Sequence, residues 1–186
     1  MRLFVAINCP QQVRETVWAA AAPFRDSKFP IRWVEKDLIH LTVKFLGEVA
    51  RQRVEEITRV LYEIGRANGT FSLGILGFGA FPTPSRARVV WAGCEPAKEL
   101  ELLQHEIEDA LGALGFAPEG KPFRPHLTLG RGKRDGTGNQ MRGLAELIET
   151  TELCEEMAVT SIDLMESHPG PKGARYEKIF TAELGH

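Results

Sequence analysis

The sequence predicts an α+β protein of two similar halves, in which two mainly antiparallel sheets line a central cleft and helices lie outside them. Two observations support this prediction. Strand-like runs of alternating polar and apolar residues are separated by single amphipathic helices. The tripeptide His-Leu-Thr occurs once in each half, within a similar order of elements. Because no linker rich in Pro, Gly and Ser separates the halves, we expect residues 1–186 to form a single two-lobed domain.

The first half has the periodicities of a strand, a helix, a strand pair, a second helix and a second strand pair. Pro10 follows a short apolar run and stands where a helix opens, and later apolar residues recur at helical spacing as far as Phe24. We expect the two strand pairs, at 31–46 and 70–92, to form hairpins. The predicted elements are a strand at 2–7, a helix at 11–24, strands at 31–34 and 38–46, a helix at 52–64, and strands at 70–77 and 86–92.

The segment 38–46 alternates between apolar and polar residues. Its apolar members are Ile39, Leu41, Val43 and Phe45, and its polar members are His40, Thr42 and Lys44. Side chains of a strand point alternately to its two faces. We therefore expect the apolar four, Phe45 included, to lie in the core and the polar three to share the other face.

The second half repeats this order. Its first helix carries an apolar stripe on one side and acidic residues on the other, which is typical of a helix that covers a sheet. The predicted elements are a helix at 98–114, a strand at 125–131, a short helix at 141–149, and strands at 157–165 and 174–182 that form a hairpin.

The charge balance excludes a protein that coats nucleic acid through a broadly basic surface. The chain has 23 Lys and Arg against 25 Asp and Glu, for a formal net charge of −2. This value averages two opposed segments, since 121–134 has five basic side chains and no acid, whereas 146–156 has five acids and no base. Such a local positive charge suits the recognition of a small anionic group rather than the coating of a nucleic acid.

The cysteines and apolar segments predict a cytoplasmic protein with no membrane partner. Cys9, Cys94 and Cys154 are odd in number and far apart, as expected in a reducing compartment. The apolar run at 3–7 is too short for a signal peptide, and glycines and prolines interrupt the longest uncharged stretch, 67–85. We also expect a monomer.

The repeated tripeptide is the strongest functional signal. His40 and Thr42 recur as His126 and Thr128, in a chain with only five histidines. In each strand the imidazole and the hydroxyl project from the same face, because they are two residues apart. A single strand histidine is usually structural. A duplicated pair related by an approximate twofold axis would instead place two imidazoles and two hydroxyls around one small anion, and a phosphate group fits this arrangement.

This set of groups suits hydrolysis of a phosphodiester by in-line displacement. Such a reaction needs a base for the attacking water and an acid for the leaving oxygen, and histidine can fill either role near neutral pH. Threonine hydroxyls can donate hydrogen bonds to the non-bridging oxygens. The chain has no zinc-binding spacing such as H-E-x-x-H, H-x-H or C-x-x-C and no G-x-x-x-x-G-K-[ST] loop, so we expect neither a metal nor another cofactor.

With these motifs the chain resembles the two-histidine phosphoesterases, and among them the bacterial and archaeal RNA 2′,3′-cyclic phosphodiesterases, also called 2′-5′ RNA ligases. The likeness covers nearly the whole chain. It is carried by MRLFVAI at the start, IRWVEKDLIHLTVKFLGEV at 31–49, GFGAFPTPSRARVVWAG at 77–93, KPFRPHLTLGR at 121–131 and SHPGPKGARYEKI at 167–179.

The resemblance implies metal-independent opening of a terminal 2′,3′-cyclic phosphate of RNA to a 2′-phosphomonoester, with weak reversible 2′-5′ ligation. It implies that His40 is the proton donor to the leaving 3′ oxygen and that His126 is the proton acceptor from water. It also implies that Thr42, Thr128 and Arg131 bind the phosphate. The residues alone leave the acid and base roles open, because a twofold axis makes the histidines nearly equivalent.

Other residues and functions remain open at this point. Phe45, Phe78 and Phe81 are candidates for stacking a base, although the strand alternation favours a core position for Phe45. Ser167 and Tyr176 either cover the cleft or belong to a structural hairpin. One alternative function is a cyclic phosphodiesterase for a small nucleotide such as ADP-ribose 1″,2″-cyclic phosphate. Another is a module that only binds a nucleotide or RNA end, although retention of both histidines and both threonines argues against it.

Overall fold

The computed structural model describes residues 1–133, 138–171 and 173–185, and it confirms the predicted α+β class. The strands are β1 (Arg2–Asn8), β2 (Ile31–Trp33), β3 (His40–Glu48), β4 (Phe71–Phe81), β5 (Val89–Cys94), β6 (His126–Gly132), β7 (Cys154–Val159), β8 (Ser161–His168) and β9 (Arg175–Glu183). The helices are α1 (Gln11–Ala20), α2 (Ala22–Asp26), α3 (Val54–Ala67), α4 (Lys98–Ala113) and α5 (Leu144–Thr150).

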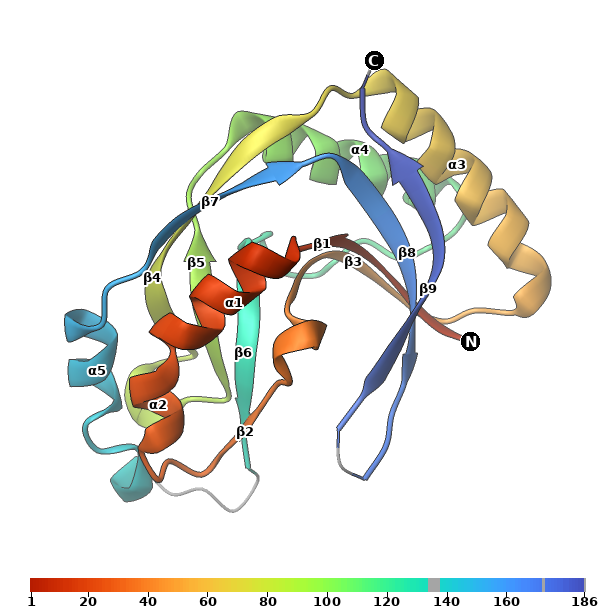
Figure 1. Ribbon diagram of the computed structural model, residues 1–186. Coiled ribbons are helices and arrows are strands. Elements are labelled where there is room, and N and C mark those ends of the chain that lie inside the picture. Colours follow the sequence, from red (N-terminus) through yellow and green to blue (C-terminus); the bar gives the residue numbers. More distant parts are fainter. Residues whose placement is uncertain (134–137, 172, 186) are drawn as a thin grey trace.

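The strands form one arching antiparallel sheet in the order β7-β4-β5-β6-β3-β1-β8-β9, with β2 added beside β6 (Figure 1). The contact between β3 and β6, where Leu41 lies opposite Leu127, divides this order into two sets of four strands. Each set corresponds to one of the two predicted sheets. Because the two sets are joined through this residue pair, they form one continuous sheet.

Strands from the two halves of the chain pair with one another on both sides of the sheet. β4 of the first half pairs with β7 of the second half, and β8 of the second half pairs with β1 of the first. Helices α3 and α4 lie against the half of the sheet that contains β3, β8 and β9, and α1, α2 and α5 lie at the other half (Figure 1). Buried apolar side chains from both halves form one continuous cluster. No helix within the described residues is long and apolar enough to cross a membrane.

Several element boundaries differ from the prediction. The expected hairpin at 31–46 is wrong, because β2 pairs with β6 instead of β3. Gly130 makes this pairing possible, since a Cβ atom there would lie 2.5 Å from the Ile31 side chain. The expected strand at 157–165 is two strands, β7 and β8, and the expected first helix is interrupted between α1 and α2 close to Pro23, which lacks an amide hydrogen.

A β-bulge reverses the two faces of β3 after Val43. In the pairing with β1, Ala6 lies opposite Thr42 and Val5 opposite Lys44, so Val43 has no partner. Lys44 is consequently buried, with 1% exposure, and Phe45 is 55% exposed. The prediction that Lys44 shares the face of the polar residues and that Phe45 lies in the core is wrong for this reason.

The same irregularity occurs in β6. Val90 of β5 lies opposite Gly130 and Trp91 lies opposite Thr128, which leaves Leu129 unpaired. Val43 and Leu129 occupy the same place relative to the histidine that begins each strand. The bulge in β6 therefore turns Arg131 toward the face of its histidine, as the bulge in β3 turns Phe45.

Candidate active site

The pairing of Leu41 with Leu127 brings the four predicted site residues together. Side chains directly opposite one another in an antiparallel pair lie on the same face, and neighbours along a strand lie on opposite faces. Both leucines are fully buried in the core. His40, Thr42, His126 and Thr128 therefore all lie on the other face of the sheet, which we call the site face, and each of them is partly exposed.

The two histidines are anchored identically. His40 Nδ1 lies 2.7 Å from the carbonyl oxygen of Leu38, and His126 Nδ1 lies 2.6 Å from that of Arg124. A carbonyl oxygen only accepts hydrogen bonds, so Nδ1 carries the hydrogen in both rings and Nε2 is the atom available for chemistry. His40 Nε2 lies 3.1 Å from Thr42 Oγ1, whose hydroxyl donates to it when the ring is neutral.

The surroundings favour the neutral form of both rings. Burial lowers the pKa of His40; the Leu38 carbonyl opposes this effect, and the charges of Arg131 and His126 add to it. Burial also lowers the pKa of His126, against the Arg124 carbonyl and together with Arg131. Arg131 is therefore near enough to both histidines to act on them electrostatically, and the same positive charge would attract an anion bound beside them.

Aromatic rings frame each histidine. The His40 ring lies 5.2 Å from Phe4 and 5.1 Å from Tyr176, which meets it edge-on. The other histidine, His126, lies 5.2 Å from Phe81 and 6.4 Å from Trp91. These rings contribute to the burial of the imidazoles, and burial is the main cause of the lowered pKa values.

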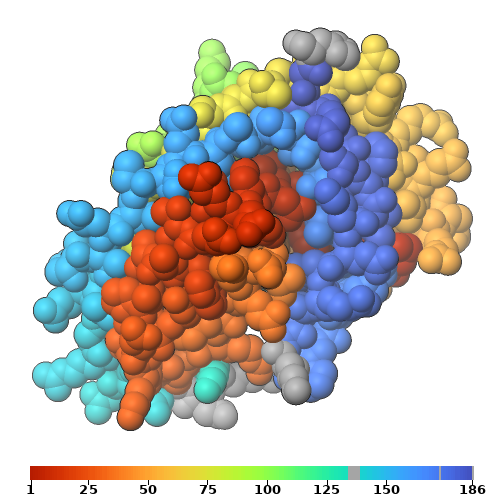
Figure 2. Space-filling model, in the orientation of Figure 1, coloured from red at the N-terminus to blue at the C-terminus, as the bar shows by residue number. Residues whose placement is uncertain are grey.

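The predicted supporting residues have different positions. Phe81 lies at the site beside His126, but Phe78 is a core residue whose ring is 4.9 Å from Phe24. Ser167 and Tyr176 form a registered pair in the β8–β9 hairpin, so this segment is a hairpin that also brings Tyr176 to the site. Figure 2 shows this hairpin, in blue, beside the N-terminal segments in red and orange.

The basic segment lies partly at the site. Arg131 is exposed, and the guanidinium of Arg124 lies 6.0 Å from the Phe81 ring centre. Lys121 and Lys133 are exposed, and Arg134 lies outside the described residues. The positive charge predicted from the sequence thus has a structural counterpart next to His126.

Several residues near the histidines were not predicted from the sequence. Trp91 reaches His126 because Gly79 leaves room for its ring: a Cβ atom at Gly79 would be 2.2 Å from that ring. Phe4 reaches His40 from β1. The strand register reveals these neighbours, and the one signal for them in the sequence is that β1 and β5 contain aromatic residues.

A buried carboxylate supports the strand next to His40. Asp163 is 2% exposed and accepts hydrogen bonds from Asn8 Nδ2 at 2.6 Å and Thr181 Oγ1 at 2.5 Å. Asn8 lies opposite His40 in the pairing of β1 with β3. The network ties β1, β8 and β9 together beside the site.

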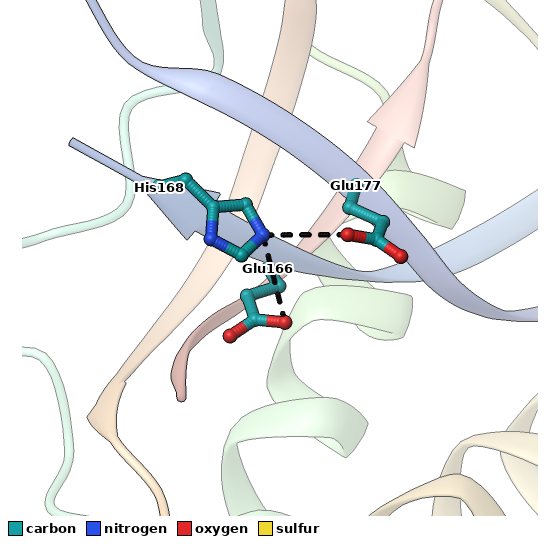
Figure 3. Close-up of side chains that lie close together, drawn as sticks. All are labelled: Glu166, His168 and Glu177. Carbon is teal, nitrogen blue, oxygen red and sulfur yellow. Dashed lines mark ion pairs between the residues drawn. The ribbon is translucent and has the colours of Figure 1, made fainter. Parts of the chain in front are cut away.

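Three side chains of the types that can bind a metal ion also converge elsewhere in the described part of the chain. Glu166, His168 and Glu177 each offer one ligand atom, and these atoms lie within 4.8 Å of one another (Figure 3). All three belong to the β8–β9 hairpin. They are separate from His40 and His126, which begin β3 and β6.

The sequence has curated relatives over nearly its whole length. Among curated relatives, the RNA 2′,3′-cyclic phosphodiesterase of Methanothermobacter thermautotrophicus is 32% identical over 178 residues, covering 95% of each chain. The protein of the same name from Archaeoglobus fulgidus is 33% identical, covering 96% of this chain and 98% of its own.

Solved structures share the fold over the whole chain. A crystal structure of a protein from Thermus thermophilus has a TM-score of 0.83 and 25% identity, and covers 99% of this chain and 98% of its own. Escherichia coli LigT complexed with 3′-AMP has a TM-score of 0.78 and 27% identity, covering 100% of this chain and 98% of its own. The sequence model of the 2′-5′ RNA ligase superfamily matches residues 13–171. This protein belongs to the 2′-5′ RNA ligase superfamily.

Proposed function

We propose that this protein is an RNA 2′,3′-cyclic phosphodiesterase, which opens a terminal 2′,3′-cyclic phosphate to a 2′-phosphomonoester and a free 3′ hydroxyl. The observation that carries the proposal is the Leu41–Leu127 register, which sets two identically anchored histidines and two threonines on one face. The RNA substrate is supported by the names of the curated relatives, which align over nearly the full chain.

In the proposed mechanism, His126 Nε2 takes a proton from a water molecule as its oxygen attacks phosphorus. The bond between phosphorus and the 3′ oxygen breaks, and protonated His40 gives its Nε2 proton to that oxygen. Acid and base thus stand on opposite sides of the phosphorus, as in-line displacement requires. The assignment of donor and acceptor rests on the resemblance of the two motifs to those of the family.

The same site must also stabilise the negative charge on the non-bridging phosphate oxygens during the reaction. Thr42 and Thr128 donate their hydroxyl hydrogens to non-bridging oxygens, and Arg131 offsets the charge that develops on them. Both histidines have a lowered pKa without substrate. A bound phosphate raises both values, because negative charge favours the imidazolium, and His40 can then hold the proton that it donates.

The proposal extends to the setting of the reaction. The two imidazoles supply both proton transfers, so no metal ion takes part in the chemical step. A 5′ hydroxyl of a second RNA in place of water would give a 2′-5′ linkage, which is the weak ligation reaction. Cys9, Cys94 and Cys154 are free thiols, which supports a cytoplasmic location, and we propose a monomer in which the whole chain acts as one unit.

The test is turnover of a short RNA that ends in a 2′,3′-cyclic phosphate, with EDTA present, followed by phosphorus NMR of the product. We expect a 2′-phosphomonoester and a higher kcat/KM on RNA than on ADP-ribose 1″,2″-cyclic phosphate. A 3′-phosphomonoester would contradict the proposed orientation of the substrate. Preference for the ADP-ribose compound would assign the site to a small nucleotide, and binding without turnover would leave only a binding module.

A further inference from the structure

The β8–β9 hairpin carries a compact group of side chains on its face opposite to Tyr176. Glu166 and His168 are two residues apart in β8, and Glu177 lies directly opposite Glu166 in β9, so all three share one face. Ser167 and Tyr176, the intervening registered pair, point to the other face, where Tyr176 meets His40. Figure 3 shows the three side chains converging.

The two negative carboxylates of this group favour the binding of a cation between them. Two carboxylates placed directly opposite one another in adjacent strands repel and destabilise the pairing. The Glu166 side chain is 16% exposed, so water screens its charge only in part. The histidine lies between the two carboxylates, with Nε2 3.6 Å from Glu166 Oε2 and 3.4 Å from Glu177 Oε2.

These separations do not fit a hydrogen-bonded imidazolium. A charged N–H donates to a carboxylate at about 2.7–2.9 Å. Within the described residues, the Nε2 atom of His168 is shielded from solvent and makes no hydrogen bond, although the His168 side chain as a whole is 35% exposed. A buried ring nitrogen that faces two carboxylate oxygens without bonding to either one points to a missing partner between them.

A metal ion fits these distances. Zinc bound by histidine nitrogen and carboxylate oxygen has bonds of about 2.0–2.2 Å in tetrahedral geometry, which separates neighbouring ligand atoms by roughly 3.3–3.6 Å. The two N···O distances of 3.6 and 3.4 Å lie in this range. We propose that Glu166, His168 and Glu177 form a zinc-binding site, with water as the fourth ligand, that fixes the β8–β9 hairpin.

The site would be structural. It stands behind the strand pair that presents Tyr176, so zinc there would hold the two strands in register and hold the Tyr176 ring against His40. This consequence for His40 rests on the proposed function, whereas zinc binding does not. The ion takes no part in the phosphodiester chemistry.

The experiment uses the full chain, freed of metal with a chelator, dialysed and titrated with Zn²⁺ in a calorimeter. We expect one equivalent to bind and affinity to fall by about 100-fold or more in His168→Ala and Glu177→Gln. The matched control is His105→Ala, because His105 is exposed and, among the described residues, forms an ion pair with the single carboxylate of Asp109 at 3.5 Å. Its affinity should equal that of the parent.

A second measurement separates this site from the active site. Co²⁺ in place of Zn²⁺ should give the visible absorption of a tetrahedral ion, which His168→Ala should lose and His126→Ala should keep. Zinc also should slow amide hydrogen exchange in β8 and β9 of the parent but not of His168→Ala. No binding by the parent would overturn the zinc site, and so would binding that survives His168→Ala and disappears in His126→Ala.

The two proposals fail in different ways. If the hairpin site is wrong, His168→Ala binds Zn²⁺ as the parent does, whatever its activity. If the metal-independent chemistry is wrong, EDTA abolishes turnover even in His168→Ala, which lacks the hairpin ligand. The outcome for one proposal therefore leaves the other testable.

Discussion

Replacing Lys44 by methionine tests the β-bulge that shapes the site face. Lys44 Nζ donates to Glu108 Oε1 at 2.6 Å and to the Ala117 carbonyl at 2.9 Å, and its side chain is fully buried. The variant leaves the mostly buried Glu108 carboxylate without its cation. Breaking a buried pair in this way costs about 3–5 kcal/mol. In a chain of this size that corresponds to a fall in Tm on the order of 10 °C.

Urea and thermal unfolding of the parent and Lys44→Met would measure this cost. The control is Lys36→Met, because Lys36 forms an exposed ion pair with Glu15 at 3.8 Å and should change stability by less than about 1 kcal/mol. The double variant Lys44→Met/Glu108→Leu should recover part of the loss, since it removes both buried charges. Equal, small effects for Lys44→Met and Lys36→Met would place Lys44 on an exposed face and refute the bulge.

Three further predictions concern the site and the thiols. Arg131→Gln removes a charge that lowers the pKa of both histidines, so the pH profile of kcat/KM should move to higher pH and KM for RNA should rise; an unmoved profile would remove Arg131 from the site. Phe45→Ala should raise KM for RNA about 5- to 100-fold through loss of base stacking, with little change in Tm, whereas a large fall in Tm would return Phe45 to the core. Burial raises the pKa of Cys9 and Cys94 to about 12, while Cys154 is exposed, so Ellman's reagent should titrate one thiol in the native protein and three in urea.

The α+β class and the four central residues could be predicted because they depend on local periodicity. The alternation in each His-Leu-Thr segment fixes which side chains share a face, and the repeat indicates two equivalent strands. The sequence could not predict that Leu41 lies opposite Leu127, because pairing between distant strands depends on the packing of the whole chain. That single register determines how the two motifs meet.

The errors have a common physical cause. A β-bulge shifts the alternation by one residue and leaves no clear mark in the sequence, so a strict alternation puts Lys44 and Phe45 on the wrong faces. The sequence also does not show which distant strands pair, as with β2, which pairs with β6. The hairpin cluster is hidden for the same reason: Glu177 joins Glu166 and His168 across two strands, at no recognised metal-binding spacing.

The two-histidine mechanism predicts the rates at which His40→Ala and His126→Ala open a cyclic phosphate, measured on the same RNA end with EDTA present. Each variant should lose a factor of about 10² to 10⁴ in kcat, because each removes one proton transfer from the transition state. His105→Ala, an exposed histidine on α4, should retain the parent rate. Unchanged turnover in both His40→Ala and His126→Ala would contradict the two-histidine mechanism.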